Sequence, residues 1–329
     1  MTDAARDGTG RRDELQALLG ETSRTFALAI PRLPEPRMTE VTVAYLLFRI
    51  ADTFEDATTW GIPARVAALR ELADLLDDPA PGRLADCARR WHDAAPVENA
   101  GYLRLLASTP LVFEALGGLE PAAAALIAGH TQRTCLGMAG FLAQADADGV
   151  LRLQTLEELR AYCYTVAGIV GEMLTELFLL EGDVVAPIAP RLRERAAAFG
   201  EALQLVNILR DAASDVCEGR ALVPPAVARA ELFALARADL LRASEYTLAL
   251  QATGARRGIV AFTALPILLA IATLERVERA GPGAKISRAE VARLITLMET
   301  NLRLGRPVVR LAGSAAAARR PAASARKPG

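Results

Sequence analysis

The chain has 329 residues, 38 basic and 39 acidic side chains, and a formal net charge of −1 at pH 7. Because the charges balance and no basic patch stands out, we do not expect nucleic acid as a partner. Apolar residues make up 52% of the chain, which is typical of a globular protein with a large core.

The numbers and spacing of cysteines and histidines limit the kinds of metal site and catalytic site that the chain can form. The cysteines lie far apart and form no CxxC pair, so we interpret them as reduced thiols of a cytosolic protein rather than as disulfides or a zinc site. With only two histidines, histidine-based metal catalysis and a Ser-His-Asp arrangement have few candidates. The cysteines are Cys87, Cys135, Cys163 and Cys217, and the histidines are His92 and His130.

The ends and the apolar runs of the chain bear on its location. The first residues lack the apolar core of a signal peptide. The longest uncharged run, 258–274, contains Pro266 and is shorter than the roughly 20 residues that a spanning helix needs, so we interpret it as a buried helix. We therefore expect a cytoplasmic protein without a signal peptide or transmembrane anchor, with peripheral membrane association as an alternative.

Helical periodicity runs through almost the whole chain, whereas the alternation typical of strands is scarce. Two of the predicted helices begin with the spacing of a capping box, Thr155 with Glu158 and Ser287 with Glu290. In chain order, we predict helices over 11–19, 39–57, 63–76, 100–115, 121–143, 155–181, 190–216, 226–252, 258–280 and 287–304.

Glycine- and proline-rich breakers separate these segments, among them the stretch from Pro79 to Gly82. No breaker is long enough to link two domains. We therefore predict a single all-α domain over residues 21–312, preceded by a flexible N-terminal segment and first helix over residues 1–20. Residues 313–329, rich in Ala, Arg and Pro, are predicted to form a disordered tail.

The first chemically informative stretch is AYLLFRIADTFEDA, residues 44–57. Tyr45, Arg49, Asp52 and Asp56 share one face of the predicted helix, with Glu55 one step round, while the rest of the stretch is apolar. Acidic residues near a helix C-terminus oppose the helix dipole, so their presence does not serve helix stability. The alternative is a helix end that simply reaches solvent.

The second stretch, residues 200–220, repeats this pattern. Gln204, Asn207, Asp211 and Asp215 recur at helical spacing on one face of an otherwise apolar helix. Unpaired buried carboxylates are costly, so these two aspartates imply a cation or a water-filled cavity opposite them. Oxygen ligands of this kind suit Mg²⁺, which is bound through one or two carboxylates, waters and substrate phosphates.

Two such helices facing each other would set four aspartates around one cavity. Divalent cations would relieve the repulsion between these like charges and would bind an anion such as diphosphate. Arginines lie in or beside the same segments, and the guanidinium fork fits phosphate oxygens. They are Arg24, Arg49, Arg210 and Arg220.

The order of these motifs resembles the squalene and phytoene synthase family, and most closely its squalene branch. The resemblance covers roughly residues 23–288. Its motifs are SRTF at 23–26, YLLFRIADTFED at 45–56, GMAGFL at 137–142, YCYTVAG at 162–168, LQLVNILRDAASD at 203–215 with EGR at 218–220, and LPILLAIATL at 265–274.

The resemblance implies an all-α isoprenoid synthase bundle with a central active-site cavity. The implied reaction joins two farnesyl diphosphates head to head through presqualene diphosphate to squalene, with Mg²⁺ (Mn²⁺ as an alternative) and NADPH. The alternatives are a phytoene or dehydrosqualene synthase, with geranylgeranyl diphosphate as the phytoene substrate, and a presqualene diphosphate synthase. None of these three uses hydride transfer. A silent scaffold that binds prenyl lipids is a further alternative, and the oligomeric state is open.

The resemblance also assigns roles to residues. The metal ligands would be Asp52, Asp56, Asn207, Asp211 and Asp215. The catalytic residues would be Tyr162 and the same four aspartates. The diphosphate and farnesyl groups would meet Ser23, Arg24, Phe26, Tyr45, Arg49, Gln204, Arg210 and Arg220. Lys285 would meet NADPH.

The apolar surplus suggests a tunnel for prenyl chains. Candidates for its walls are Phe178, Leu179, Leu180, Phe199, Leu203, Val206, Phe262, Leu265, Leu268 and Leu269. In one departure from the family pattern, Tyr164 and Thr165 replace the His-Tyr pair that usually follows Tyr-Cys. A squalene-like product would also favour peripheral membrane contact for its release.

Overall fold

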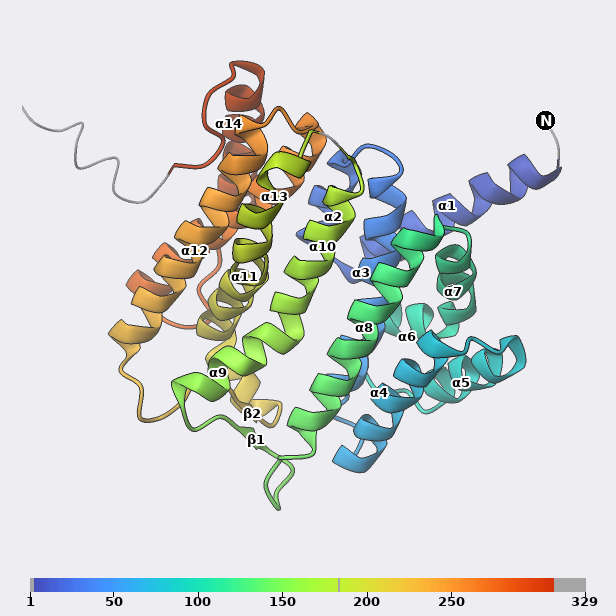
Figure 1. Ribbon diagram of the computed structural model, residues 1–329. Coiled ribbons are helices and arrows are strands. Elements are labelled where there is room, and N and C mark those ends of the chain that lie inside the picture. Colours follow the sequence, from blue (N-terminus) through green and yellow to red (C-terminus); the bar gives the residue numbers. More distant parts are fainter. Residues whose placement is uncertain (1–2, 183, 311–329) are drawn as a thin grey trace, which may run out of the picture.

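The computed structural model describes residues 3–182 and 184–310, and within them the protein is almost entirely helical, as predicted (Figure 1). The α-helices are α1 (Asp3–Thr22), α2 (Phe26–Ala29), α3 (Arg37–Glu55), α4 (Ile62–Asp77), α5 (Pro81–Asp93), α6 (Ala100–Ala107), α7 (Thr109–Gly117), α8 (Pro121–Leu142), α9 (Leu156–Cys163), α10 (Ile169–Leu179), α11 (Ala189–Cys217), α12 (Arg229–Ala252), α13 (Arg257–Ala280) and α14 (Arg288–Arg303). The short elements are η1 (Ile30–Arg32), η2 (Tyr164–Gly168), η3 (Ala186–Ile188), β1 (Leu151–Arg152) and β2 (Arg220–Ala221). The predicted tail, residues 313–329, lies outside the described residues.

Helix α5 was missed by the sequence prediction. We interpreted Pro79 to Gly82 as a breaker, but α5 begins at Pro81. Proline fits the first turn of a helix because its missing N–H would be unbonded there in any case. The predicted helix 100–115 is likewise two helices, since α6 ends at Ala107 and Pro110 stands in the first turn of α7.

The predicted helix 155–181 is also divided. Thr155 and Glu158 form the expected capping box at the start of α9. A single π-helical turn, η2, then separates α9 from α10. Such turns bend helices and occur often at functional sites. Here, Val166 and Ala167 of the turn line a cavity described below.

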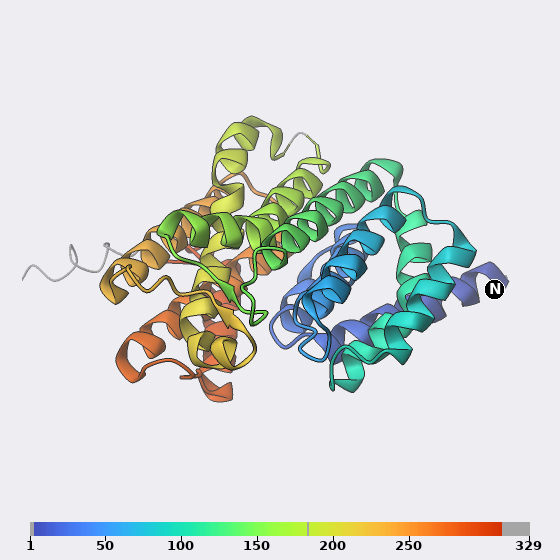
Figure 2. The same cartoon turned by 90° about the horizontal axis from the view of Figure 1, so that it is seen from below.

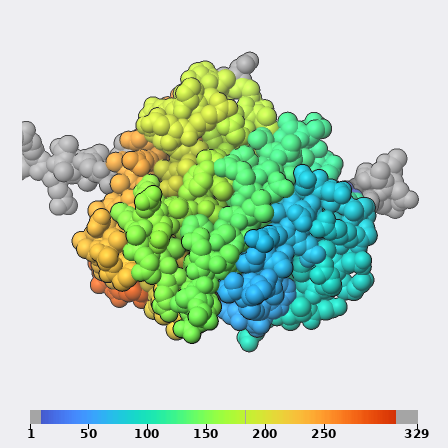
Figure 3. Space-filling view, turned by 60° about the horizontal axis from the view of Figure 1, so that its bottom comes forward, coloured from blue at the N-terminus to red at the C-terminus, as the bar shows by residue number. Residues whose placement is uncertain are grey.

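The helices form two groups around the molecular centre. Seen from below, the N-terminal helices α3 to α7 gather on one side and the C-terminal helices α11 to α14 on the other (Figure 2). Helix α8 packs against α4 and α3, and also against α10, so it joins the two groups. In the space-filling view, the green α8 lies directly against the blue α4 (Figure 3).

Helix α11 approaches the η2–α10 segment at backbone contact distance. A Cβ atom added at Gly200 would lie 1.8 Å from the carbonyl oxygen of Ala167, and one added at Gly171 would lie 2.0 Å from that of Ala196. Only glycine permits this approach. The close packing fixes α11 against η2, whose residues Val166 and Ala167 form part of the cavity wall.

The uncharged run 258–274 lies in α13. Of the helices that the structure describes, α13 is long and apolar enough to cross a membrane, but 72% of its most apolar window is buried inside the fold. The interpretation of this run as a buried helix is therefore confirmed.

Candidate active site

A polar chamber lies between α3 and α11, and all four aspartates of the two acidic motifs line it. The prediction that these two helix faces meet across one cavity is therefore confirmed. The other lining residues include the three arginines Arg49, Arg210 and Arg220, the tyrosines Tyr102 and Tyr162, the amides Gln204 and Asn207, and Glu55.

Arg220 connects the two acidic motifs. Its Nη1 donates a hydrogen bond to Oδ1 of Asp56, beyond the end of α3, and its Nη2 donates to Oδ1 of Asp215, on α11, at 3.2 Å. Glu218 accepts a further bond from Nη2 at 2.7 Å. Arg220 itself stands in β2 opposite Leu151 of β1, so a short parallel ladder fixes its backbone.

The remaining aspartates also have arginine partners. Nη1 of Arg49 lies 3.3 Å from Oδ2 of Asp52, one turn away on α3. Arg210 donates to both carboxylate oxygens of Asp211, with an Nε–Oδ1 distance of 2.8 Å. Every aspartate of the two motifs is thus paired with a guanidinium group, so the like charges of the chamber are partly compensated.

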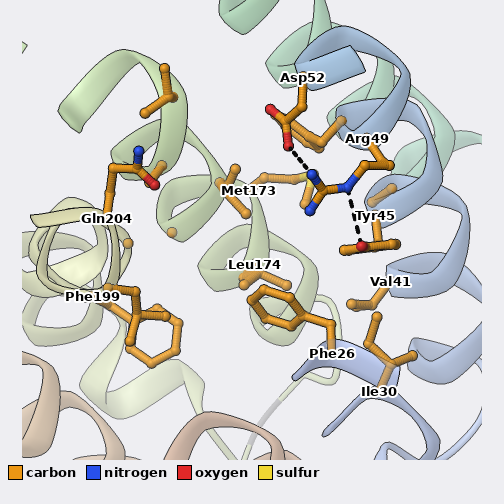
Figure 4. A pocket seen from close by; sticks show the side chains of 18 of the residues that line it. Phe26, Ile30, Val41, Tyr45, Arg49, Asp52, Met173, Leu174, Phe199 and Gln204 are labelled. Atoms are coloured by element: carbon orange, nitrogen blue, oxygen red, sulfur yellow. Dashed lines mark hydrogen bonds and ion pairs between the residues drawn. The ribbon is translucent and has the colours of Figure 1, made fainter. Parts of the chain in front are cut away.

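Arg49 is held from several directions. Its Nε donates to the hydroxyl of Tyr45 at 3.2 Å, and that hydroxyl donates to the backbone carbonyl of Thr22 at 2.7 Å. Figure 4 shows Arg49 reaching from α3 toward Asp52 and Tyr45, with Gln204 across the cavity. The bond to Thr22 ties this arginine to the C-terminal end of α1.

Three carboxylates of the chamber, those of Asp52, Glu55 and Asp215, have raised pKa values. Burial raises the pKa of Asp52, although Arg49 and Arg220 partly offset this effect. Burial, together with the neighbouring Asp211 and Glu218, raises the pKa of Asp215 to about 7. Burial also raises the pKa of Glu55 to about 7. A divalent cation would favour the ionised form of each of these groups.

The donor set fits Mg²⁺ shared with a diphosphate rather than a closed protein cage. Among the described residues, no three acidic, histidine or cysteine side chains converge as a ready metal cluster. Mg²⁺ commonly takes one or two carboxylates and completes its shell with waters and phosphates. The oxygen donors available for this purpose are those of Asp52, Asp56, Asn207, Asp211 and Asp215.

Tyr162 lies at the edge of the chamber beside Glu55. Its hydroxyl donates to Oε1 of Glu55 at 3.0 Å, and its ring meets Phe141 edge to face at 5.3 Å. Burial, with the adjacent carboxylate, raises the pKa of Tyr162 well above its usual value near 10. The proton therefore stays on the phenol at neutral pH and is directed at a carboxylate.

An apolar cavity adjoins the polar chamber. Five residues line both, so the two spaces share one boundary: Arg49, Asp52, Val166, Gln204 and Asn207. Most of the other walls are apolar and come from α3, α10 and α11, with Phe26 and Ile30 from the start of the chain and Phe262 from α13. A ligand with a charged head and a hydrocarbon tail fits this arrangement.

Only three of the ten candidate wall residues line the apolar cavity, namely Phe199, Leu203 and Phe262. Phe178 is buried in the core instead, and the exposed fraction of Leu180 is 43%. The prediction missed Met173 and Leu174 of α10, as well as Phe48 of α3. A helix that is apolar on most sides gives no sign of which side faces a cavity.

Three predicted site residues lie outside both cavities. The hydroxyl of Ser23 accepts a hydrogen bond from the backbone N–H of Phe26 at 2.9 Å, and Arg24 beside it is exposed. Lys285 is exposed in the loop after α13. That loop lies close to the chamber, since the N–H of Gly283 donates to the carbonyl of Arg210 at 2.6 Å. The roles of Ser23, Arg24 and Lys285 stay predictions.

Phe26 and Tyr45 lie together, with ring centroids 5.7 Å apart, at one end of the apolar cavity. By contrast, Tyr164 lines neither cavity, and its hydroxyl bonds to Arg133 and Glu172 near the surface. Tyr102, which does line the chamber, was missed. It stands alone in its segment, so no spacing pattern could have pointed to it.

Comparison with known proteins gives consistent results. Residues 19–244 match the squalene/phytoene synthase family. The chain is 28% identical to the squalene synthase of Gibberella zeae over 83% of its own length and 61% of that protein. It is also 28% identical to a probable squalene synthase of Neurospora crassa, over 86% of this chain and 61% of that protein. The chain thus spans about three fifths of the length of these relatives.

Solved structures show the same fold. A TcSQS–ligand complex superimposes with a TM-score of 0.69 at 25% identity, covering 96% of this chain and 94% of that one. A dehydrosqualene synthase complex gives a TM-score of 0.53 at 20% identity, covering 92% of this chain and 100% of the other. The all-α fold is therefore shared with TcSQS and with the dehydrosqualene synthase.

Proposed function

Because the chain belongs to the squalene/phytoene synthase family, we propose that it joins two farnesyl diphosphates head to head, first to presqualene diphosphate and then to squalene. The observation that carries this proposal is the chamber of four aspartates and three arginines opening into an apolar cavity. Squalene, rather than another product of the family, is supported by the similarity to the squalene synthase from Gibberella zeae and the probable squalene synthase from Neurospora crassa.

The arginines of the chamber would bind the diphosphate. Arg49, Arg210 and Arg220 each present N–H groups at the chamber, and a guanidinium group pairs well with phosphate oxygens. Mg²⁺ held by the aspartates would supply further neutralisation of the charge that develops on the leaving diphosphate. When the arginines bind the diphosphate, they would release their aspartate partners. The carboxylate oxygens of these aspartates would then be free to bind Mg²⁺.

The apolar cavity would hold the prenyl chains. Its boundary with the chamber, at Asp52, Gln204 and Asn207, would place the allylic carbon beside the diphosphate site. Apolar walls such as Phe199 and Leu174 would keep water from the carbocation that forms when diphosphate leaves. Premature quenching to an alcohol would thereby be suppressed.

Tyr162 and Glu55 would accept the proton that the substrate releases. Closing the cyclopropane ring releases a proton from the carbon chain. The hydroxyl of Tyr162 donates to Glu55 at 3.0 Å, so a proton taken up at the phenol oxygen has a direct path to the carboxylate. The negative face of the same ring would stabilise the nearby cation.

The reductive step and the location of the protein are part of the proposal. NADPH would supply the hydride that ends the reaction, and Lys285, in the loop tied to Arg210, is the residue that we assign to its phosphates. We also propose a cytoplasmic protein that meets the membrane at its surface to release product. The proposal of a reducing compartment rests on the sequence, in which the four cysteines form no CxxC pair.

Product analysis tests the proposal. The purified chain is incubated with farnesyl diphosphate or geranylgeranyl diphosphate and Mg²⁺, with and without NADPH, and the hydrocarbon is identified by mass spectrometry. NADPH-dependent squalene is the expected result. A C40 product from geranylgeranyl diphosphate, the same hydrocarbon irrespective of NADPH, or a halt at presqualene diphosphate would assign the chain to another branch of the family. Prenyl binding without any product would indicate a silent scaffold.

A further inference from the structure

The guanidinium group of Arg49 lies between two tyrosine rings. Its Cζ is 5.5 Å from the ring centroid of Tyr45, on its own helix, and also 5.5 Å from that of Tyr102, on α6. Contacts of this length over an aromatic face are attractive, because the ring face is negative. Two aromatic contacts therefore hold the guanidinium group in place.

Helix α6 is anchored so that Tyr102 meets the chamber. The side chain of Asn99 accepts hydrogen bonds from the N–H groups of Gly101 and Tyr102 at the start of the helix. A Cβ atom at Gly101 would lie 3.1 Å from the carbonyl oxygen of Glu21, so α6 begins hard against the end of α1. The ion pair of Arg104 with Glu21 also joins α6 to the end of α1.

The hydroxyl groups of the two tyrosines differ. That of Tyr45 is occupied, since it accepts from Arg49 and donates to Thr22. Tyr102 is half-buried and lines the polar chamber, and no described residue forms a hydrogen bond with its hydroxyl. A hydroxyl on a residue that lines the chamber, without a partner among the described residues, is available to a ligand.

We propose that Tyr102 is a diphosphate-binding residue that acts in two ways: its ring holds the Arg49 guanidinium group at the edge of the chamber, and its hydroxyl donates to a phosphate oxygen. The identification of the ligand rests on the proposed function. The placement of Tyr102, by contrast, rests on the ring contact, the cavity and the anchored start of α6.

Two substitutions separate the two roles. Tyr102→Phe removes the hydroxyl and keeps the ring, whereas Tyr102→Leu removes both. With inorganic pyrophosphate and Mg²⁺ as the probe in calorimetry, we expect Kd to rise about 3- to 10-fold for Tyr102→Phe and about 10- to 50-fold for Tyr102→Leu. The KM for farnesyl diphosphate should follow Kd, while kcat changes less.

A double-mutant cycle with Arg49→Gln tests whether the ring acts through the arginine. In that background, Tyr102→Leu should weaken pyrophosphate binding no more than Tyr102→Phe does, because the ring has lost its partner. Thermal unfolding of each variant separates a loss of binding from a loss of structure. If Arg49→Gln does not fold, the contrast between the Phe and Leu variants decides the ring's role.

The outcomes distinguish this inference from the proposed function. Unchanged pyrophosphate binding in Tyr102→Leu would overturn the role of Tyr102 even if the wild-type chain makes squalene. A full Tyr102→Leu effect that persists in the Arg49→Gln background would overturn the action through Arg49. If the wild-type chain makes no hydrocarbon, the proposed function fails, and pyrophosphate binding still decides the role of Tyr102.

Discussion

Arg220 contacts both acidic motifs at once, and its loss would leave carboxylates without a partner. We expect Arg220→Gln to lower the free energy of unfolding of the metal-free protein by about 1–3 kcal/mol. This is less than the ~3–5 kcal/mol typical of a fully buried pair, because the exposed fraction of the Asp56 side chain is 40%. Thermal unfolding in EDTA measures the effect.

Mg²⁺ should restore part of this loss, because a cation can neutralise Asp56 and Asp215 in place of the guanidinium group. The matched control is Arg152→Gln, which removes an exposed pair with Asp146 and should change stability by no more than ~1 kcal/mol. Equal destabilisation by the two substitutions, or a Mg²⁺ effect no larger in Arg220→Gln than in the wild type, would contradict the bridging role of Arg220.

Tyr162 and Tyr246 allow a comparison of two buried phenols. Tyr162 faces the chamber and bonds to Glu55, whereas Tyr246 shares a hydrogen bond of 3.0 Å with Thr175 in the core. We expect Tyr162→Phe to lower the turnover of farnesyl diphosphate by ~10²-fold, as is typical when an acid–base group is lost. Tyr246→Phe should cost only ~1 kcal/mol of stability and leave turnover unchanged. Similar turnover in both variants would remove Tyr162 from the chemistry.

At the scale of elements, the backbone contact between α11 and η2 makes a sharp stability prediction. A Cβ atom at Gly200 would lie 1.8 Å from a backbone oxygen, which cannot yield as a flexible side chain can. We expect Gly200→Ala to cost at least ~2 kcal/mol, seen as a melting temperature lower by several degrees. Gly129→Ala is the control, because nothing lies within 4 Å of its added Cβ and alanine favours a helix interior. Similar melting temperatures for the two variants would show that α11 can move away from η2.

A buried charge cluster joins α9, α11 and α12. Asp239, only 2% exposed, lies 3.5 Å from Arg160 and 3.5 Å from Arg242, and Arg160 also pairs with Glu201. Burial raises the pKa of Asp239 above its usual 3.8, and the two arginines only partly offset this. Folding therefore favours the neutral acid.

The sign of the pH effect follows from this shift. Stability that the neutral acid contributes is fully present below the unfolded pKa and is lost as the pH rises through the raised folded pKa. Asp239→Asn mimics the neutral form, so its melting temperature relative to the wild type should increase between pH 4 and pH 8. A difference that is constant or decreases over this range would show that the arginines favour the ionised form.

The element predictions fail where local rules admit two readings. Pro81 can break a helix or begin one, and the sequence around it does not say which, so α5 was missed. Similarly, an apolar period runs unbroken through Val166, where one π-helical turn bends the chain. Such turns depend on packing against α11, which involves residues some thirty positions away and is not visible in a local window.

At the scale of the whole molecule, the sequence predicted the centre of the site better than its edges. The two aspartate pairs, Arg49, Arg210 and Tyr162 stand in helical segments whose polar faces are readable from spacing, and they meet in one chamber. Tyr102 comes from a distant helix without a pattern. Residues on the edges of a cavity are selected by tertiary packing, so spacing alone cannot identify them.

The chamber lies between the N-terminal and C-terminal groups of helices, so a ligand that fills it should act on both (Figure 2). Mg²⁺ alone must compete with arginines for the aspartates, and pyrophosphate alone must compete with aspartates for the arginines. When both ligands are added, pyrophosphate binds the arginines and so frees the aspartates, and Mg²⁺ binds the freed aspartates. We therefore expect the pair to stabilise the fold by about 3 kcal/mol at concentrations near 100 times Kd, and by more than the sum of the separate effects.

Hydrogen exchange measured by mass spectrometry locates this effect. With both ligands present, amide exchange should slow in α3 and in α11, because Asp52 of α3 and Asp211 and Asp215 of α11 would contact the bound ion. Asp211→Asn should weaken the protection in both helices. The bound ligands would add a second connection between the two acidic motifs, beside the hydrogen bonds of Arg220 to Asp56 and Asp215. Protection confined to one of the two helices, or strictly additive stabilisation by the separate ligands, would mean that the two acidic motifs do not share one diphosphate.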